Sequence, residues 1–212
     1  LELYLHDASA EGGDATAYFA VSELVTILGR EGYMNTMPGL LADLYDCQKL
    51  RVSPGTLATG GLVQKNVYVT FLSASTPAWL VTAINPSVIE GGFTSRVIFV
   101  VDDNRKRSIA WPKKRAAEAR EAIERSYRET IEESRRTGPI GISPGGLKKF
   151  TNWYNKRASH HDPFQSSFEA REDDHLLRVA ACLAINDGTF EIQDRHIGYG
   201  SKVISSVKDG AN

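Results

Sequence analysis

The chain has 212 residues, a formal net charge of −1 at pH 7, 42% hydrophobic residues and 24% charged residues. This is the composition of a globular protein with one core, or with a core and a small second domain. No apolar run approaches the roughly 18 residues of a membrane-spanning helix, so we expect no membrane partner. The near-neutral charge means that any contact with nucleic acid must come from local clusters.

The start of the chain and its two cysteines indicate which kind of protein the chain comes from and where that protein is located. The chain begins at Leu1 rather than Met and shows no secretory signal, so we interpret it as a trimmed segment of a longer, cytoplasmic protein. Cys47 and Cys182 lie far apart in apolar neighbourhoods, which predicts two reduced, buried thiols. Two Cys and five His offer no zinc-ligand spacing.

The first half predicts alternating strands and helices. Apolar strands without polar alternation are typical of a sheet that is covered on both faces. In chain order we expect a strand at Ala17–Val21, a helix around Leu40–Tyr45, a hairpin formed by 50–52 and 56–58, a strand at Asn66–Leu72, a helix at Trp79–Ile84 and a strand at Arg96–Val101.

The second half predicts helices only. A long charged helix with one narrow apolar stripe, from Ala116 to Ile131, occupies Lys113–Arg136. Further helices are expected from Ser143, over Glu169–Asn186 and over Asp194–Val207, with a short extended piece at 190–192. We therefore predict an α/β domain over residues 1–112 and an α-helical domain over residues 113–212.

Two polar segments follow predicted strands, where open α/β sheets place their ligands. Glu23 could polarise an attacking water in a nucleotide hydrolase, and Ser22 could hold a magnesium-bound water. Ser75 and Thr76 could contact a γ-phosphate. The simpler interpretation of both segments is helix capping, with Pro77 at the first helical position.

Two groups of basic side chains also admit two interpretations. Arg96 follows a double glycine and could pair with a carboxylate, or reach the phosphate of a neighbouring subunit as an arginine finger. Arg171, His175 and Arg178 share one helical face, which is either a solvated face with salt bridges or a phosphate sensor.

The phosphate-binding loop itself is missing from the chain. The most similar string, Gly55 to Gly61, has Gly where the loop needs Lys. The clusters Arg105–Arg107 and Lys113–Arg115 are interpreted as solvated loops. His160 and His161 are interpreted as a loop pair; a hydrolase that uses them with Asp162 stays a minor alternative.

The order of these motifs resembles the primase-helicase-type P-loop ATPases of phages and integrative elements, and the ATPase core of minichromosome-maintenance helicases. The order is strand–Ser–Glu, a helix ending in Leu44-Tyr45-Asp46, a basic hairpin, strand–Ser-Ala-Ser-Thr-Pro, then Gly-Gly-Phe-Thr-Ser-Arg and a helix bearing Arg171 and Arg178-Val179-Ala180. The resemblance implies a partial P-loop NTPase core (AAA+/RecA-like), without its Walker A segment, followed by a helical lid.

The resemblance also implies roles for individual residues. Glu23 is the Walker B glutamate, with Ser22 in place of the usual magnesium-associated Asp, and Ser75 or Thr76 is the sensor. Arg96 is the finger, and Arg171 with Arg178 senses nucleotide from the lid. The hairpin from 49 to 59 faces DNA through the basic residues Lys49, Arg51 and Lys65.

Together these features predict an ATP-dependent DNA helicase or translocase module of a phage or mobile-element replication protein. Its expected cofactors are ATP and Mg²⁺, and its expected partners are DNA, as a single strand, and further subunits in a homo-oligomeric ring. The alternative is a non-catalytic adaptor that binds nucleic acid or protein and retains a degenerate ATPase fold. Ser22 and the missing phosphate loop favour that alternative.

Overall fold

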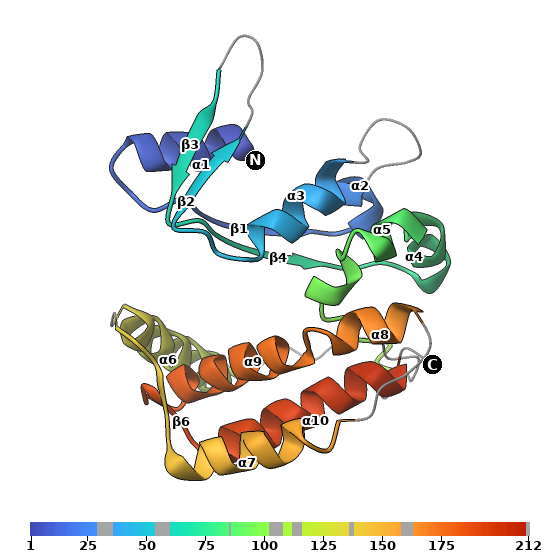
Figure 1. The fold of residues 1–212 in the computed structure, drawn as a ribbon. Coiled ribbons are helices and arrows are strands. Elements are labelled where there is room, and N and C mark those ends of the chain that lie inside the picture. The colour runs from blue at the N-terminus through green and yellow to red at the C-terminus, as the bar shows by residue number, and fades with distance from the viewer. Residues whose placement is uncertain are drawn as a thin grey trace. The chain divides into compact units, whose positions relative to one another are not determined.

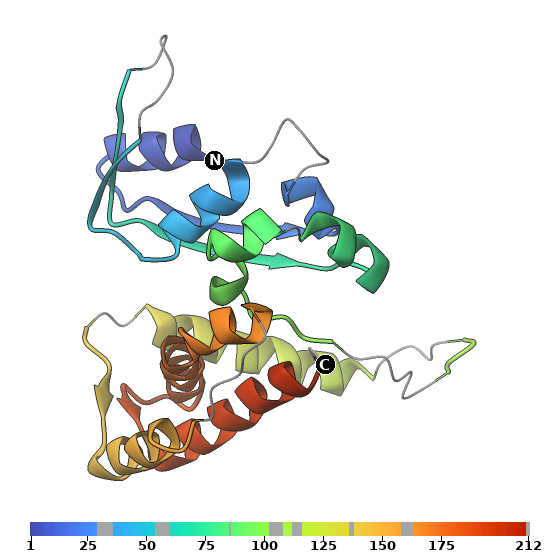
Figure 2. The ribbon, with the colours of Figure 1, turned by 45° about the vertical axis from the view of Figure 1, so that its right-hand side comes forward.

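The computed structural model describes residues 1–28, 36–53, 60–84, 86–101, 108–111, 116–135, 138–157 and 163–210. The chain forms two compact units, Leu1–Val97 (unit 1) and Ile98–Asn212 (unit 2), which Figures 1 and 2 draw from two directions. Unit 1 mixes helices and strands, and unit 2 is mostly helical, so the chain is a mixed α/β protein with small parallel sheets. The boundary between the units precedes the one that we placed after residue 112.

Unit 1 contains most of the strands. Its elements are α1 (Glu2–Ala10), β1 (Thr16–Val21), α2 (Leu24–Leu28), α3 (Thr36–Leu44), β2 (Leu50–Ser53), β3 (Leu62–Lys65), β4 (Tyr68–Ser73), α4 (Pro77–Ala83), α5 (Pro86–Glu90) and the 3₁₀ turn η1 (Thr94–Arg96). The strands expected at 17–21 and 66–72 and the helix expected at 79–84 are confirmed, with shifted ends. Helix α1 was not predicted, because its apolar residues show little helical periodicity.

The strand predicted at Arg96–Val101 is wrong. The turn η1 ends at Arg96, and residues 97–101 join no strand ladder. Ile98 instead packs against the buried hydrophobic cluster of unit 2. The apolar run therefore serves side-chain packing, which a strand pattern in the sequence does not distinguish from sheet pairing.

Strands β1 and β4 form a parallel pair in which Thr16 lies opposite Tyr68 and Val21 lies opposite Ser73. One face of this pair carries stacked rings of Phe19 and Phe71, with centroids 5.7 Å apart. Near its start the same face packs against a cluster of buried residues from α1, α3 and the flanking loops: Leu5, Ala15, Leu44 and Val67.

The other face of the β1–β4 pair is open. Tyr18 is 66% exposed, and Tyr68 and Leu72 are also exposed. Parallel sheets are nearly always covered on both faces, as we also expected here. Among the described residues neither strand has a second hydrogen-bonded neighbour, so this pair has room for further strands and a covering layer.

Strands β2 and β3 form the predicted hairpin, but in a longer version. The first strand is confirmed, whereas its antiparallel partner is Leu62–Lys65 rather than 56–58. Residues 54–59, at the tip, lie outside the described residues. Alternate residues of both strands turn toward α1 and are buried, and the opposite face exposes Leu50, Val52 and Val63.

Arg51 is the centre of a polar network that connects the hairpin to two helices. Its Nε donates to Asp43 of α3 at 2.5 Å, and its Nη1 donates to Glu2 of α1 at 3.0 Å and to Gln64 at 2.9 Å. Ser53 donates to the same Glu2 carboxylate at 2.6 Å. Burial alone lowers the pKa of Arg51, but its hydrogen bonds to Asp43 and Glu2 outweigh this effect and raise the pKa above its ordinary value.

Replacing Arg51 by Ala should therefore destabilise unit 1 by about 1–3 kcal/mol, because Gln64 and two carboxylates lose their shared partner. Urea denaturation followed by circular dichroism measures the loss. Lys65→Ala, an exposed change in the same hairpin, should stay within about 0.5 kcal/mol of the wild type. Equal stability of the two variants would contradict the structural role of Arg51.

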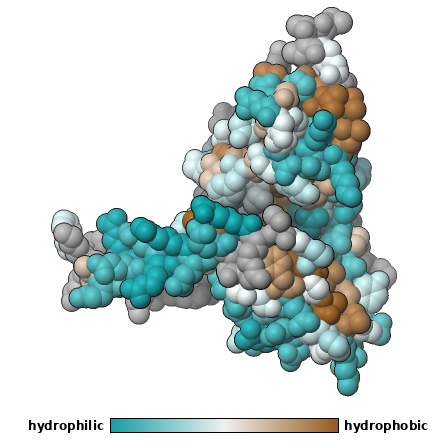
Figure 3. All heavy atoms as spheres, turned by 90° about the vertical axis from the view of Figure 1, so that its left-hand side faces the viewer, coloured by the Kyte–Doolittle hydropathy of each residue, from teal (hydrophilic) through white to brown (hydrophobic). Residues whose placement is uncertain are grey.

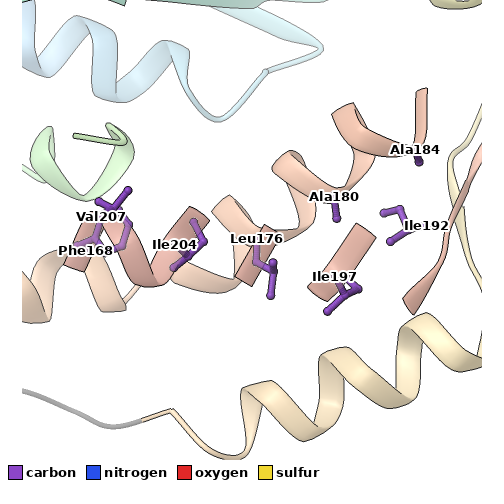
Figure 4. Close-up of a cluster of buried hydrophobic side chains, with 8 residues drawn as sticks. All are labelled: Phe168, Leu176, Ala180, Ala184, Ile192, Ile197, Ile204 and Val207. Atoms are coloured by element: carbon purple, nitrogen blue, oxygen red, sulfur yellow. The ribbon is translucent and has the colours of Figure 1, made fainter. Parts of the chain in front are cut away.

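Unit 2 is built from helices around two very short strands. Its elements are α6 (Ala117–Ser134), β5 (Gly141–Ile142), α7 (Pro144–Tyr154), α8 (Pro163–Glu169), α9 (Glu172–Asn186), β6 (Glu191–Ile192) and α10 (Asp194–Gly210). The predicted helices are confirmed, and β5 pairs with β6 in parallel. Figure 4 shows the core, in which Leu176 and Ala180 of α9 meet Ile197 and Ile204 of α10.

The predicted apolar stripe and the two cysteines differ in exposure from typical apolar residues. The apolar stripe of α6 is largely exposed, with Ile123 55% and Tyr127 68% exposed, whereas the side of α6 that Figure 3 shows is mostly hydrophilic. Cys47 is half-buried and Cys182 is exposed, although both were expected to be buried; both are free thiols. None of the described helices combines the length and the apolar character that crossing a membrane requires.

The contact between α9 and α10 predicts where unit 2 is most sensitive. Leu176 is fully buried and lies against Gly200, where an added Cβ would come within 2.8 Å of a Leu176 methyl. Leu176→Ala should lower the free energy of unfolding by about 2–5 kcal/mol through lost burial and a cavity. Leu147→Ala, a change at an exposed leucine, is the control and should cost less than about 0.5 kcal/mol in the same thermal-unfolding measurement.

Candidate functional site

The parallel pairing of β1 and β4 places the loops that follow them at one edge of the pair. Two bonds join these loops directly. The backbone N–H of Leu24 donates to the carbonyl of Ala74 at 2.8 Å, and the Ser73 hydroxyl donates to the carbonyl of Val21 at 3.0 Å. The structure therefore brings the predicted segments Ser22–Glu23 and Ser75–Thr76 together.

Glu23 stands at this edge with its carboxylate exposed to solvent. Its backbone carbonyl accepts a hydrogen bond from Thr26 at 3.0 Å at the start of α2, which the buried Leu24 and Leu28 anchor. The carboxylate makes no ion pair or hydrogen bond with any other described side chain or backbone group. Glu23 is thus held by its backbone and is chemically available, as is the exposed hydroxyl of Ser22.

The hydroxyls on the β4 side have local partners. Thr76 is the N-cap of α4: its Oγ1 accepts from the backbone N–H of Trp79 at 3.4 Å, and Pro77 occupies the first helical position. Ser75 makes one long hydrogen bond, 3.4 Å, to the carbonyl of Thr76. The capping interpretation is therefore confirmed for Thr76, and Ser75 is the freer hydroxyl of the two.

Arg96 is held by residues of its own unit. Its Nη1 donates to the carbonyl of Gly92 at 2.9 Å, its Nη2 lies 3.8 Å from a carboxylate oxygen of Asp46, and its guanidinium carbon lies 5.8 Å from the ring centroid of Tyr45. Only 16% of the side chain is exposed. This conformation agrees with the first of the two interpretations of Arg96, in which it pairs with a carboxylate.

The double glycine before Arg96 has a steric role. Gly92 has a φ of +73°, and a Cβ there would come within 2.7 Å of the guanidinium of Arg96. The neighbouring Phe93 is fully buried and stacks on Phe71 of β4. Phe93 thus fixes η1 on the sheet, and Gly92 leaves the space in which Arg96 turns back toward α3.

Arg96→Ala should consequently lower the stability of unit 1 by about 1–3 kcal/mol, since it removes an ion pair with Asp46 and a bond to the Gly92 carbonyl. A residue that acts only on a neighbouring subunit would leave the stability unchanged. Differential scanning fluorimetry on Arg96→Ala, beside the exposed Lys49→Ala, separates these outcomes.

The remaining nucleotide-sensing candidates belong to unit 2. Arg171 occupies the position before the first residue of α9 without a capping bond from its side chain, and its guanidinium lies 3.7 Å from the Asp174 carboxylate, one turn later. Arg178 is exposed on the same helix. His175, expected between them on a cationic stripe, is instead buried and stacks on Phe168 with ring centroids 5.2 Å apart. The stripe is therefore interrupted at its centre.

The three predicted DNA contacts differ in their surroundings. Lys49 and Lys65 are exposed at the base of the hairpin. Arg51 is buried in its network with Asp43 and Glu2, so its charge is neutralised within the unit. An Arg51 contact with the DNA backbone does not fit this placement, because the guanidinium already has three partners.

Several candidates lie outside the described residues: Gly55–Thr59, Arg105–Arg107, Lys113–Arg115 and His160–Asp162. Within the described part of the chain, no group of three or more His, Cys, Asp or Glu side chains is arranged to hold a metal ion. Sequence reasoning missed the partners of the two arginines, Glu2 and Asp43 for Arg51 and Asp46 for Arg96. The sequence did draw attention to Asp46, because Asp46 is the last residue of the Leu44-Tyr45-Asp46 motif.

Comparison with known proteins does not assign the chain to a family. No protein-family model, no curated protein and no solved structure matches the chain. Function must therefore be argued from the residues and their placement.

Proposed function

We propose that the chain is part of an ATP-dependent DNA helicase or translocase module, with its catalytic edge formed by the loops after β1 and β4. The observation that carries the proposal is the exposed carboxylate of Glu23 beside the Ser73–Thr76 loop. Open α/β proteins bind ligands outside the carboxyl ends of their parallel strands, which is where Glu23 lies. A carboxylate without a protein partner at that edge can accept a proton from an attacking water.

This edge provides only some of the groups that a site for Mg²⁺ and ATP needs. The oxygen atoms of Glu23, Ser22 and Ser75 are of the kind that suits Mg²⁺ and its bound waters. No lysine-bearing, glycine-rich phosphate loop occurs in the sequence. In this proposal the loop comes with a further strand that pairs with the open edge of β1 or β4.

Glu23 would orient and deprotonate the water that attacks the γ-phosphate, and Ser75 would hydrogen-bond to that water or to the phosphate. Arg96 would serve a neighbouring subunit of a homo-oligomeric ring only after exchanging Asp46 for a phosphate. Arg171 and Arg178 would sense nucleotide from unit 2. Lys49 and Lys65 would contact DNA, and Arg51 would hold the hairpin that carries them.

Glu23→Gln tests the proposed role of the Glu23 carboxylate, because the substitution keeps the shape of the side chain and removes the base. In ATPase assays on the whole gene product, it should lower kcat by about 10²–10⁴-fold and leave KM nearly unchanged. Glu11→Gln, which alters an exposed glutamate beyond α1, is the matched control. Normal turnover in Glu23→Gln would refute the role of this carboxylate.

A non-catalytic adaptor is the second candidate. Two observations favour it: Ser22 stands where such sites use an acidic residue, and Arg96 is engaged inside its own unit. Titration of the whole gene product with a fluorescent ATP analogue distinguishes the candidates. Saturable, Mg²⁺-dependent binding supports the motor, and its absence at millimolar nucleotide supports the adaptor.

A further inference from the structure

Helices α7 and α10 lie side by side in unit 2 and run in the same direction (Figures 1 and 2), since each follows one strand of the parallel β5–β6 pair. Gly145 of α7 lies beside Asp194 at the start of α10, and Lys149 lies beside Gly198 one turn later. A Cβ at Gly198 would come within 2.7 Å of the Lys149 ammonium nitrogen. The glycine therefore lets the Lys149 side chain extend across α10.

This pair of helices is rich in uncompensated positive charge. Residues 138–157 include four basic residues and no acidic one. Of these, Arg157 turns toward Asp173 and stacks on Tyr154, whereas Lys148, Lys149 and Lys156 are exposed. The three lysines make no ion pair with a described carboxylate.

Helix α10 adds a lysine and an aromatic ring. Lys202 lies one turn after Gly198 and is exposed, with its ammonium nitrogen 5.5 Å from the ring centroid of Tyr199. Tyr199 itself is 60% exposed. Asp194 is the first residue of α10 and lies near Gly145, and Asp187, the residue after α9, pairs with Arg195. The middle of the helix pair thus combines lysines with an open aromatic ring.

We propose that this surface, defined by Lys148, Lys149, Lys156, Tyr199 and Lys202, binds a single-stranded nucleic acid. The lysines neutralise successive phosphates, and Tyr199 offers a face on which an unpaired base stacks. The proposal deepens the proposed function, on whose DNA partner it rests, but it places the contact in unit 2 and requires no hydrolysis.

A lipid surface is the weaker match to the same charges. Helices that bind in a membrane interface present a broad apolar face to the lipid. Three apolar residues of α10, Ile197, Ile204 and Val207, are buried in the core of unit 2, and Phe150 of α7 packs against that core. The exposed side chains of the two helices include lysines and tyrosines, a combination suited to phosphates and bases, beside the single apolar residues Leu147 and Val203.

The test measures binding of the full chain to a fluorescein-labelled oligothymidylate of about 20 nucleotides, by anisotropy over a range of salt concentrations. The charge variant is Lys149→Glu with Lys202→Glu. Its control, Arg125→Glu with Arg128→Glu, makes the same change in net charge on the exposed face of α6. Tyr199→Ala is matched by Tyr127→Ala, also on α6 and 68% exposed.

The lysine variant should bind about tenfold more weakly and lower the salt slope by about 1.4, which corresponds to two lost phosphate contacts on a single strand. Tyr199→Ala should weaken binding to the single strand about tenfold and leave binding to a duplex nearly unchanged. Both α6 controls should bind as the wild type does.

Three results would overturn the proposal: no binding by the wild type, equal losses in the α6 controls, or displacement of the oligonucleotide by phosphatidylserine vesicles at equal phosphate concentration. ATPase activity is measured in a separate assay, so the proposed hydrolysis and the proposed nucleic-acid binding can each be disproved without the other. Glu23→Gln should bind the oligonucleotide normally. If Glu23→Gln turns over ATP normally and oligonucleotide binding depends on the lysines, the proposed motor function is wrong and the proposed binding surface is supported.

Discussion

The parallel hydrogen bonding of β1 to β4 is the constraint on which the candidate site depends. Parallel neighbours end at the same edge, so two segments about fifty positions apart in the sequence are placed together by the strand pairing. The bonds from Leu24 to Ala74 and from Ser73 to Val21 then fix the two loops to each other. The exposed carboxylate of Glu23 is a consequence of this backbone geometry.

Arg51, which is buried, and Arg96, which is partly buried, show how similar residues can serve structure instead of ligand binding. Arg51 and Arg96 were both assigned to phosphates by the resemblance, and both are engaged by carboxylates of α3 or its following turn. A planar guanidinium suits either kind of anion, so its residue type does not decide between them. The exposed lysines of the hairpin and of α7 and α10 carry the charge that remains available.

The sequence predicted the elements of this protein better than their environments. The strand at 17–21 and the helices of unit 2 follow from period and caps, which are local signals. Glu23 and the loop after β4 could be placed at one edge because strand order is implied by the motifs. Burial could not be read in this way: His175 looks polar on its helix but packs on Phe168, and Tyr127 looks apolar but stays exposed. The partners of Arg51 come from three distant segments, and no local pattern contains that information.

Two aspartates, one on α3 and one in the turn after it, connect features that were described separately. Asp43 holds Arg51 of the hairpin, and Asp46, within the next turn of chain, holds Arg96. The same short segment therefore anchors both the element proposed to touch DNA and the side chain proposed to touch nucleotide. Asp43 and Asp46 are only three positions apart, so the backbone at the end of α3 connects the Arg51 and Arg96 contacts within unit 1.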